Sequence, residues 1–217
     1  WMTVADNGDV TFSDERISDY VAGLAEKYDT YEKDVPFTTA LGETITVNSC
    51  DYGWELDQVS EVEKLKEFLL KGESVVREPL WLKMGVARTS NGIGDTYVEI
   101  DYTNQRMWFY KDGQLLVDTL VVTGNTSKDM GSPVGIFALY YKETHAILKG
   151  EDYKTPVDFW MPFYGGVGIH DAKWRDAFGG NLYQSSGSHG CINTPWANAK
   201  TIYENIDAGT PIVCYNA

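Results

Sequence analysis

The sequence contains few cysteines and few histidines, three of each among 217 residues. Three cysteines are too few for the disulfide framework of a small secreted domain, and an odd number leaves at least one thiol outside any intramolecular disulfide. Any reaction that needs an imidazole as acid or base must use one of only three side chains. Chemistry based on cysteine or histidine is therefore confined to very few positions.

Long hydrophobic runs are also missing. No apolar stretch approaches the roughly 20 residues that a membrane-spanning helix needs, and no basic-then-apolar signal peptide is present. Because the chain begins at Trp1, we expect it to be a processed or truncated piece whose targeting segment is absent.

Basic residues are scarce relative to acidic ones. Lys and Arg number 18 and Asp and Glu 32, which gives a formal net charge of −14. Such a field repels polyphosphates, so nucleic acid is excluded as a partner, and an anionic membrane surface would not hold the chain by charge. The charge is −10 over residues 1–95 and −4 over residues 96–217, which favours two different units.

The first unit shows helical signals. Ser13 precedes two acidic residues and an apolar pattern at helical spacing, which predicts a helix that ends near Tyr28. Alternation around Leu41-Gly42-Glu43 predicts a short hairpin. A second helix is predicted to begin at Ser60, with Glu63 completing a capping box, and to end before Gly72. Residues 1–90 therefore form a predicted α+β module.

The second unit, residues 91–217, follows a small-residue stretch at 89–94 and is dominated by strand patterns. Several short strands separated by turns predict a mostly-β, sandwich-like or barrel fold. One helix interrupts them, with Thr194 as its predicted N-cap, Pro195 as its first residue and Gly209 as its end. A last strand is expected at 212–215.

Two of the histidines lie near one cysteine, at Ile169-His170-Asp171 and Ser188-His189-Gly190-Cys191. A cysteine attacks as the thiolate, and a histidine near neutrality can take its proton and later protonate a leaving amine. Gly190 allows close approach of the backbone, whose N–H groups can form an oxyanion hole. These residues are the candidates for covalent catalysis.

Two other interpretations of the same residues stay open. Cys191 can be a buried, inert cysteine beside structural histidines. Alternatively, His170, His189, Cys191 and Cys214 can bind a metal, although they lack the paired C-x-x-C or H-x-x-x-H spacing of a preformed site. Aromatic residues cluster before Cys191, and of these we expect Tyr164 and Trp174 to line a substrate groove.

Ser188-His189-Gly190-Cys191-Ile192 closely resembles the nucleophile motif of the L,D-transpeptidases, the YkuD-type cell-wall enzymes. The Gly-x-Gly-Ile-His run ending at His170, 21 residues earlier, resembles their upstream histidine segment. The segments 97–101 and 132–137 resemble two further motifs of the family in the same order. Residues 13–75 resemble the peptidoglycan-binding module that often precedes this catalytic domain.

The resemblance assigns roles residue by residue. It implies that Cys191 is the nucleophile and His170 its base, with the imidazole held by the backbone carbonyl of Asp171. The backbone N–H groups of His189, Gly190 and Cys191 would line the oxyanion hole, and Ser188 and His189 would shape the site. No metal or organic cofactor is implied.

Two residues depart from the family pattern. Asp171 stands where the family usually has Gly, and Asn193 stands where it usually has Arg, two residues after the cysteine. Loss of that Arg removes a bidentate carboxylate clamp, so how the substrate carboxylate is held, and what Asn193 contributes, stay open.

The resemblance implies peptidoglycan cross-linking. A tetrapeptide stem would acylate Cys191 and release D-Ala, and a side-chain amine of a neighbouring stem would take the acyl group to form a 3→3 link. Such an enzyme bypasses penicillin-sensitive cross-linking and is acylated by carbapenems. It would face the cell wall outside the cell, on a membrane anchor. The alternatives are a cysteine carboxypeptidase or endopeptidase acting on the same stems, and a non-catalytic wall-binding module.

Overall fold

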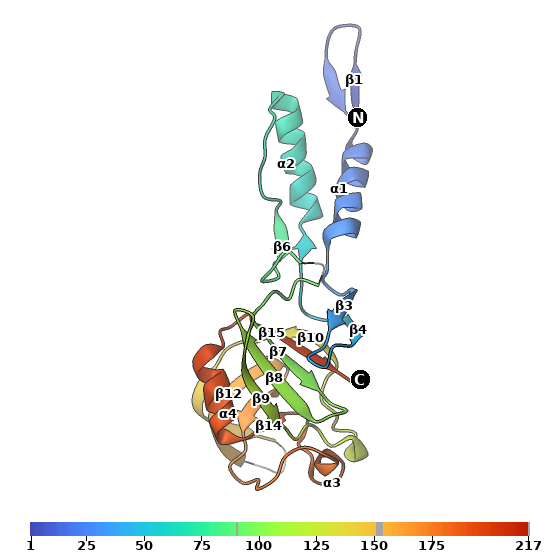
Figure 1. The fold of residues 1–217 in the computed structure, drawn as a ribbon. Helices are drawn as coiled ribbons and strands as arrows, with labels where there is room; N and C mark the ends of the chain where they lie inside the picture. Colours follow the sequence, from blue (N-terminus) through green and yellow to red (C-terminus); the bar gives the residue numbers. More distant parts are fainter. Residues whose placement is uncertain (90, 151–153, 217) are drawn as a thin grey trace.

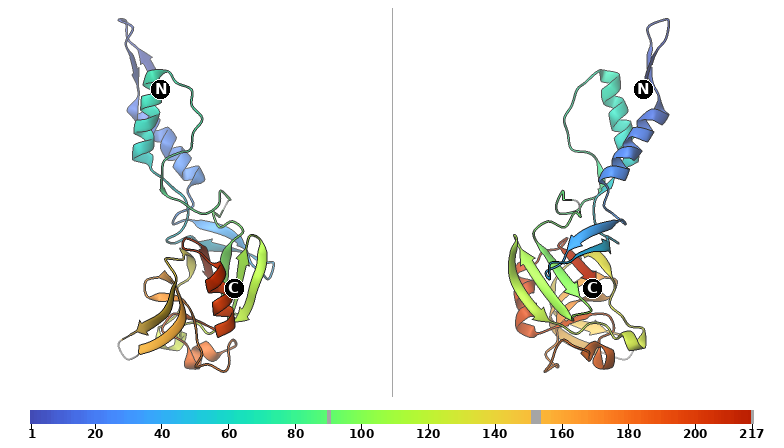
Figure 2. Two further views of the ribbon diagram at one scale, coloured as in Figure 1. Left: turned by 90° about the vertical axis from the view of Figure 1, so that its left-hand side faces the viewer. Right: turned by 45° about the vertical axis from the view of Figure 1, so that its right-hand side comes forward.

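The computed structural model describes residues 1–89, 91–150 and 154–216, and residue 90, in the predicted boundary segment, lies outside this range. The chain forms an elongated helical arm that rises from a β-rich part (Figures 1 and 2). The elements of the arm are β1 (Met2–Val4), β2 (Val10–Phe12), α1 (Asp14–Tyr28), β5 (Glu55–Leu56), α2 (Gln58–Lys71) and β6 (Trp81–Lys83).

The two helices of the arm lie side by side and bury a small apolar core. Its fully buried members are Val21 and Ala25 of α1 and Leu56 of β5, with the flanking residues Leu24, Val62, Leu65 and Trp81 packed around them. The predicted first cap is present, because the Ser13 hydroxyl accepts a hydrogen bond from the Arg16 N–H at 3.3 Å.

The start of the second helix was predicted wrongly. Helix α2 begins at Gln58 rather than at Ser60, and Asp57 is the N-cap: its Oδ1 accepts from the Ser60 N–H at 3.0 Å. The Asp57 carboxylate lies three residues before Ser60 and caps the Ser60 N–H, so the helix starts earlier than a Ser60 cap would allow. The end is as predicted, with Gly72 in the left-handed region at φ 66°.

The predicted hairpin connects the arm with the rest of the chain. Strands β3 (Asp34–Thr38) and β4 (Thr44–Asn48) pair with Phe37 opposite Ile45. Their buried side chains join Ile93, Ile136 and Val213 in one apolar cluster. The hairpin therefore packs directly on the β-rich part, and the division of the chain at residues 90 and 91 stays a prediction.

Two sheets face each other in the β-rich part, as the sandwich prediction requires. The first has the order β10-β15-β7-β8-β9 and the second β11-β12-β13-β14. Their strands are β7 (Tyr97–Asp101), β8 (Arg106–Lys111), β9 (Gln114–Leu120), β10 (Gly135–Ala138), β11 (Glu143–Lys149), β12 (Lys154–Tyr164), β13 (Val167–Asp171), β14 (Ile192–Thr194) and β15 (Pro211–Tyr215).

Both sheets and one helix contribute to a single core. Ile100 and Phe109 of the first sheet are fully buried with Met161 and Ile169 of the second. Helix α4 (Trp196–Asn205) adds Ile202. Among the helices of the described residues, none is long and apolar enough to cross a membrane.

The bounds of α4 also differ from the prediction. Thr194 is not the N-cap but the last residue of β14, opposite Asp171 of β13, and Pro195 takes the cap position. The helix ends at Asn205, with Ile206 as the C-cap, so Gly209 lies beyond it. Strand pairing on one side and burial of Ile206 on the other override the local helix signals.

Candidate active site

The predicted catalytic residues converge where β13 and β14 run in parallel. His170 lies opposite Asn193 in the register of these strands, and Cys191 directly precedes β14. These residues line one cavity of 200 Å³. The other residues lining it are Leu148, Thr155, Trp174, Arg175, Gly187, Ser188 and His189. The cavity thus unites two segments that are 21 residues apart.

Cys191 lies in an apolar wall of this cavity. It is 9% exposed and belongs to a cluster with Ala146, Val157 and Trp160. Its Sγ is 3.7 Å from the carbonyl oxygen of Gly166. Burial raises the pKa of the Cys191 thiol, and a hydrogen bond from the backbone of Gly168 only partly opposes this. At neutral pH the resting thiol therefore keeps its proton.

His170 is enclosed by two indole rings. Its ring centroid is 6.0 Å from that of the buried Trp160 and 5.9 Å from that of the half-exposed Trp174. Nδ1 is 2.9 Å from the backbone oxygen of Asp171. Burial lowers the pKa of His170, and the charge of Arg175 acts in the same direction. The imidazole is therefore neutral at rest, with Nδ1 as donor to the carbonyl and Nε2 as acceptor.

The side chain of Asp171 has a structural role. The residue is buried, and its Oδ1 accepts from the N–H groups of Asp158 and Phe159 at 2.8 and 2.9 Å. Both donors belong to β12, so the carboxylate fastens that strand beside the site. Only the backbone carbonyl of Asp171 reaches the imidazole of His170.

The turn that carries Cys191 is held by hydroxyl groups. Ser188 Oγ donates to the Cys191 carbonyl oxygen at 2.5 Å and accepts from the Gly190 N–H at 3.1 Å. Ser132 Oγ donates to the Gly190 carbonyl oxygen at 2.6 Å. Gly190 has a φ of +115°, where a side chain would be strained and its Cβ would lie 3.0 Å from Val167. Because the Gly190 N–H already binds Ser188, it differs from the free oxyanion-hole donor that the resemblance implies.

One functional candidate was missed by the sequence analysis. Arg175, on the segment after β13, lies in the cavity wall beside Asn193. When the Asn193 amide oxygen faces Arg175, it accepts from Nε at 2.7 Å and from Nη2 at 3.1 Å, and the amide nitrogen donates to His170 Nε2 at 3.1 Å. The reverse orientation would set donor against donor, so hydrogen bonding selects this one. Arg175 also donates to the backbone oxygen of Ser186.

Some of the remaining candidate residues line the cavity, and others lie away from it. Trp174 and His189 line the cavity, but Tyr164 does not, because its ring packs against Phe137 at a centroid distance of 5.0 Å. Cys214 is fully buried in the core between the sheets, away from the other members of the predicted metal set. Among the described residues, no three His, Cys, Asp or Glu side chains are grouped to hold a metal ion.

Two known families match different parts of the chain. Residues 95–214 match the YkuD family, described as the L,D-transpeptidase catalytic domain. Residues 3–77 match a family described as a putative peptidoglycan binding domain. Comparison with curated proteins gave no match.

Solved structures match nearly the whole chain. A cysteine-to-serine mutant of the Enterococcus faecium L,D-transpeptidase is 37% identical, with a TM-score of 0.88, over 99% of this chain and 87% of that one. The Ldtfm–avibactam carbamoyl enzyme is 38% identical, with a TM-score of 0.89, over 100% and 86% of the two chains. The catalytic domain of the E. faecium enzyme acylated by ertapenem is 43% identical over 56% of this chain and 97% of that one, with a TM-score of 0.51.

Proposed function

The chain belongs to the L,D-transpeptidase family and is a transpeptidase with a cell wall-associated function, and we propose that Cys191 is its nucleophile and His170 its general base. The observation that carries this proposal is their convergence on one cavity, where β13 carries His170 and Cys191 directly precedes the parallel strand β14. Cys191 is the one cysteine that lines this cavity among the described residues, and His170 is the buried histidine beside it.

The first half-reaction begins from a neutral thiol and a neutral imidazole. The entering acyl donor displaces the Asn193 amide nitrogen from His170 Nε2, and the Cys191 thiol transfers its proton to that nitrogen as Sγ attacks the carbonyl between the third stem residue, a diamino acid, and D-Ala at position four. The tetrahedral intermediate collapses, the C–N bond breaks, and His170 returns the proton to the amine of D-Ala. A thioester between the stem and Cys191 remains.

The second half-reaction repeats these steps with a new nucleophile. A side-chain amine of a neighbouring stem enters, His170 accepts its proton, and the amine attacks the thioester carbonyl. The C–S bond breaks, the thiol regains its proton, and a 3→3 cross-link is released. The apolar wall around Cys191 favours the amine over water by limiting hydration of the thioester.

Arg175 and Asn193 position the base. The guanidinium fixes the Asn193 oxygen, so the amide nitrogen must face His170 Nε2. That arrangement holds the ring in the tautomer that donates Nδ1–H to Asp171. Arg175 also carries a positive charge in the cavity wall. Because Asn193 stands where the family usually has Arg, Arg175 supplies in its place the cation that binds the carboxylate of the leaving D-Ala.

The turn at 188–191 stabilises the developing oxyanion. Ser188 holds the turn through its contacts with Gly190 and Cys191. As the family motif implies, the backbone N–H groups of His189 and Cys191 would line the oxyanion hole, and the Gly190 N–H would join them when the Ser188 hydroxyl turns away.

The two parts of the chain would work together at the cell wall. Residues 1–90 form the wall-binding module and residues 91–217 the catalytic domain, outside the cell on a membrane anchor. Because the ertapenem-acylated and avibactam-bound relatives share this fold, carbapenems would acylate Cys191 and act as covalent inhibitors. The resulting bypass of penicillin-sensitive enzymes would confer β-lactam resistance.

Intact-protein mass spectrometry tests the nucleophile. Incubation with a disaccharide-tetrapeptide, or with ertapenem, should add one acyl group to the wild-type chain and to Cys50→Ala, and none to Cys191→Ala. An adduct on Cys191→Ala would refute the assignment. Product analysis with and without an amine acceptor then separates transfer from hydrolysis: a tripeptide as the sole product in the presence of acceptor would make the enzyme a carboxypeptidase.

A further inference from the structure

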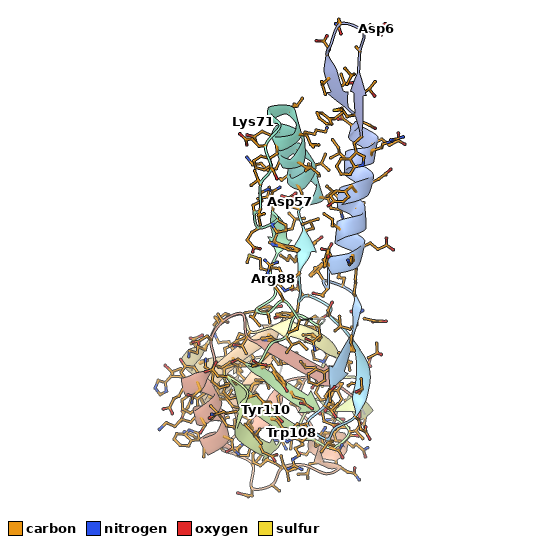
Figure 3. The ribbon with its side chains drawn as sticks, turned by 45° about the horizontal axis from the view of Figure 1, so that its top comes forward. Asp6, Asp57, Lys71, Arg88, Trp108 and Tyr110 are labelled. Carbon is orange, nitrogen blue, oxygen red and sulfur yellow. The ribbon has the colours of Figure 1, made fainter. Side chains whose placement is uncertain are left out.

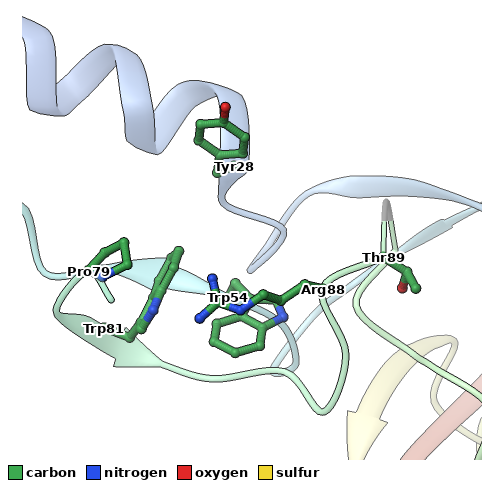
Figure 4. Close-up of a pocket in the computed structure, with 6 residues that line it drawn as sticks. All are labelled: Tyr28, Trp54, Pro79, Trp81, Arg88 and Thr89. Carbon is green, nitrogen blue, oxygen red and sulfur yellow. The ribbon is translucent and has the colours of Figure 1, made fainter. Parts of the chain in front are cut away.

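A second cavity lies where the arm meets the catalytic part, and we call it the waist pocket. It has a volume of 380 Å³ and is lined by Tyr28, Trp54, Pro79, Trp81, Arg88 and Thr89 (Figure 4). Figure 3 places Arg88 at this junction, between the helices of the arm and the sheets. Helix α3 (Leu182–Ser186) and β14, which flank the active-site cavity, lie at the other end of the catalytic part (Figure 1).

The aromatic walls of the waist pocket are fixed in place. Trp54 is 7% exposed, its backbone N–H donates to Thr30 Oγ1 at 2.9 Å, and its indole N–H donates to the Ala87 carbonyl at 2.7 Å. Trp81 meets it edge-on, with ring centroids 5.0 Å apart and planes at 65°. Two rings held at this angle form a preformed apolar corner rather than a collapsed surface.

Polar groups at this corner are few and specific. Arg88 lies over both indoles, its guanidinium carbon 4.7 Å from the Trp54 centroid and 5.4 Å from that of Trp81. Its ion pair with Glu78 joins two side chains that are both more than half exposed, so it holds the guanidinium weakly. The indole nitrogen of Trp81 is buried, and within the described part of the chain it has no hydrogen-bond acceptor. A buried donor of this kind needs an acceptor.

We propose that the waist pocket binds an N-acetylated hexosamine of the peptidoglycan glycan strand. The C–H face of a pyranose is weakly positive and packs on the negative face of an indole, here that of Trp81, the less buried of the two, once the exposed Arg88 guanidinium moves aside to meet the ring hydroxyls. The acetamido oxygen is an acceptor for the Trp81 N–H, and ring hydroxyls are acceptors for Arg88. A neutral sugar is also unaffected by the net charge of −14, which disfavours anionic wall polymers.

The proposal rests on the proposed function only for the polymer that supplies the sugar. The family described as a putative peptidoglycan binding domain matches residues 3–77, which include Tyr28 and Trp54. Trp81 and Arg88 lie beyond that match, so the segment after α2 completes the site. Because the pocket is remote from Cys191, occupancy holds the strand and leaves the chemistry of acylation unchanged.

The test compares two soluble oligosaccharides on the full chain, with tryptophan fluorescence and calorimetry as readouts. Chitotetraose carries the acetamido groups, and cellotetraose has the same linkage without them. We expect chitotetraose to bind about tenfold more tightly, since its acetamido carbonyl is a stronger and longer-reaching acceptor for the buried indole N–H than the ring hydroxyl that cellotetraose has at the same position. Trp81→Phe, which keeps an aromatic ring but loses the N–H, should remove most of that difference, and Arg88→Gln should weaken both ligands.

Tyr20→Ala is the matched control. Tyr20 forms another exposed aromatic pair on the same arm, with Trp1 at a centroid distance of 4.9 Å, so its loss should leave binding unchanged. The proposal is overturned if chitotetraose does not bind, if it binds no better than cellotetraose, or if Tyr20→Ala weakens it and Trp81→Phe does not. Ertapenem labelling of every variant is read separately: retained labelling shows a folded catalytic part, and its loss in wild type would instead count against the proposed nucleophile.

Discussion

Arg175→Met is the most informative single change in the candidate active site, because in the proposed mechanism Arg175 acts on the base His170 through Asn193. The change removes both hydrogen bonds to the Asn193 oxygen, at 2.7 and 3.1 Å, and the positive charge beside His170. The Asn193 amide is then free to turn, and in half of its orientations it presents an oxygen to His170 Nε2. That orientation favours the tautomer in which Nε2 carries the proton, and this tautomer cannot accept the proton of the thiol.

The size of the effect follows from the bonds lost. A hydrogen bond to a charged group contributes about 1.5–3 kcal/mol, and we expect about 1.4–2.8 kcal/mol of this to reach the transition state, which slows acylation about 10- to 100-fold. The loss of the cation also raises the pKa of His170. Because acylation needs the neutral imidazole, its acid limb should move to higher pH.

The assay is the second-order rate of ertapenem acylation between about pH 5 and 8, where histidine titrates. Lys173→Met is the control, since it removes a neighbouring cation that pairs with Asp158 and not with the base. Arg175→Lys separates charge from geometry: it should keep the acid limb but lose rate, because an ammonium cannot replace the planar fork. The double variant of Arg175→Met with Asn193→Ala should be little slower than either single one.

The role of Arg175 would be refuted if Arg175→Met were acylated at a rate within about twofold of wild type, with an unshifted acid limb and a thermal unfolding midpoint equal to that of Lys173→Met. Arg175 would then be an anchor for Ser186 alone.

Three further predictions concern titratable groups. His170→Ala should lose most of the acylation rate, and His189→Ala should lose less, because the backbone N–H of His189 survives. Acylation rates measured by mass spectrometry compare the two variants, and a larger loss at His189 would reverse the assignment of the base. Iodoacetamide labelling of Cys191, followed by peptide mapping, should rise only above the pH range in which a free cysteine thiol titrates, since burial raises the pKa of the Cys191 thiol; a plateau of fast labelling at pH 6 would instead reveal a resting thiolate. Glu99→Gln should raise the free energy of unfolding, measured in urea, by about 1 kcal/mol at pH 7 and have little effect at pH 4. Burial raises the pKa of Glu99, so the folded state loses stability as the pH rises through that pKa. Equal effects at both pH values would contradict this.

The sequence predicted those parts of the fold that local signals determine. Ser13 and Gly72 bound their helices as expected, because a capping hydroxyl and a left-handed glycine act within one turn. The start of α4 was misjudged because Thr194 pairs with Asp171 across a parallel strand, a contact between residues 23 apart that no local pattern reveals. Asp57 and Ser60 are both good caps, and the sequence alone could not rank them.

The same division applies to the active site. The spacing of Cys191 and His170 belongs to a recognisable motif, so the sequence alone could propose these two residues, and the structure places both at one cavity. Arg175 was not, because it lies on an irregular segment where no periodicity indicates the direction of a side chain. The absence of an arginine after Cys191 was the one available signal: in the proposed mechanism the cavity binds a substrate carboxylate and so needs a cation, and Arg175 lines the cavity from the segment that follows β13.

The neutral resting state of the pair also fits a two-step transfer. A thiolate–imidazolium pair would speed the first attack, but it would expose a thiolate to oxidation, which follows thiolate character and exposure. Burial instead keeps the Cys191 proton in place until an acyl donor enters. Once D-Ala has left with its proton, the lowered pKa of His170 returns the imidazole to its neutral form, so the acceptor amine meets a free base. In the proposed mechanism, the burial that restrains Cys191 therefore also prepares His170 for the second half of the reaction.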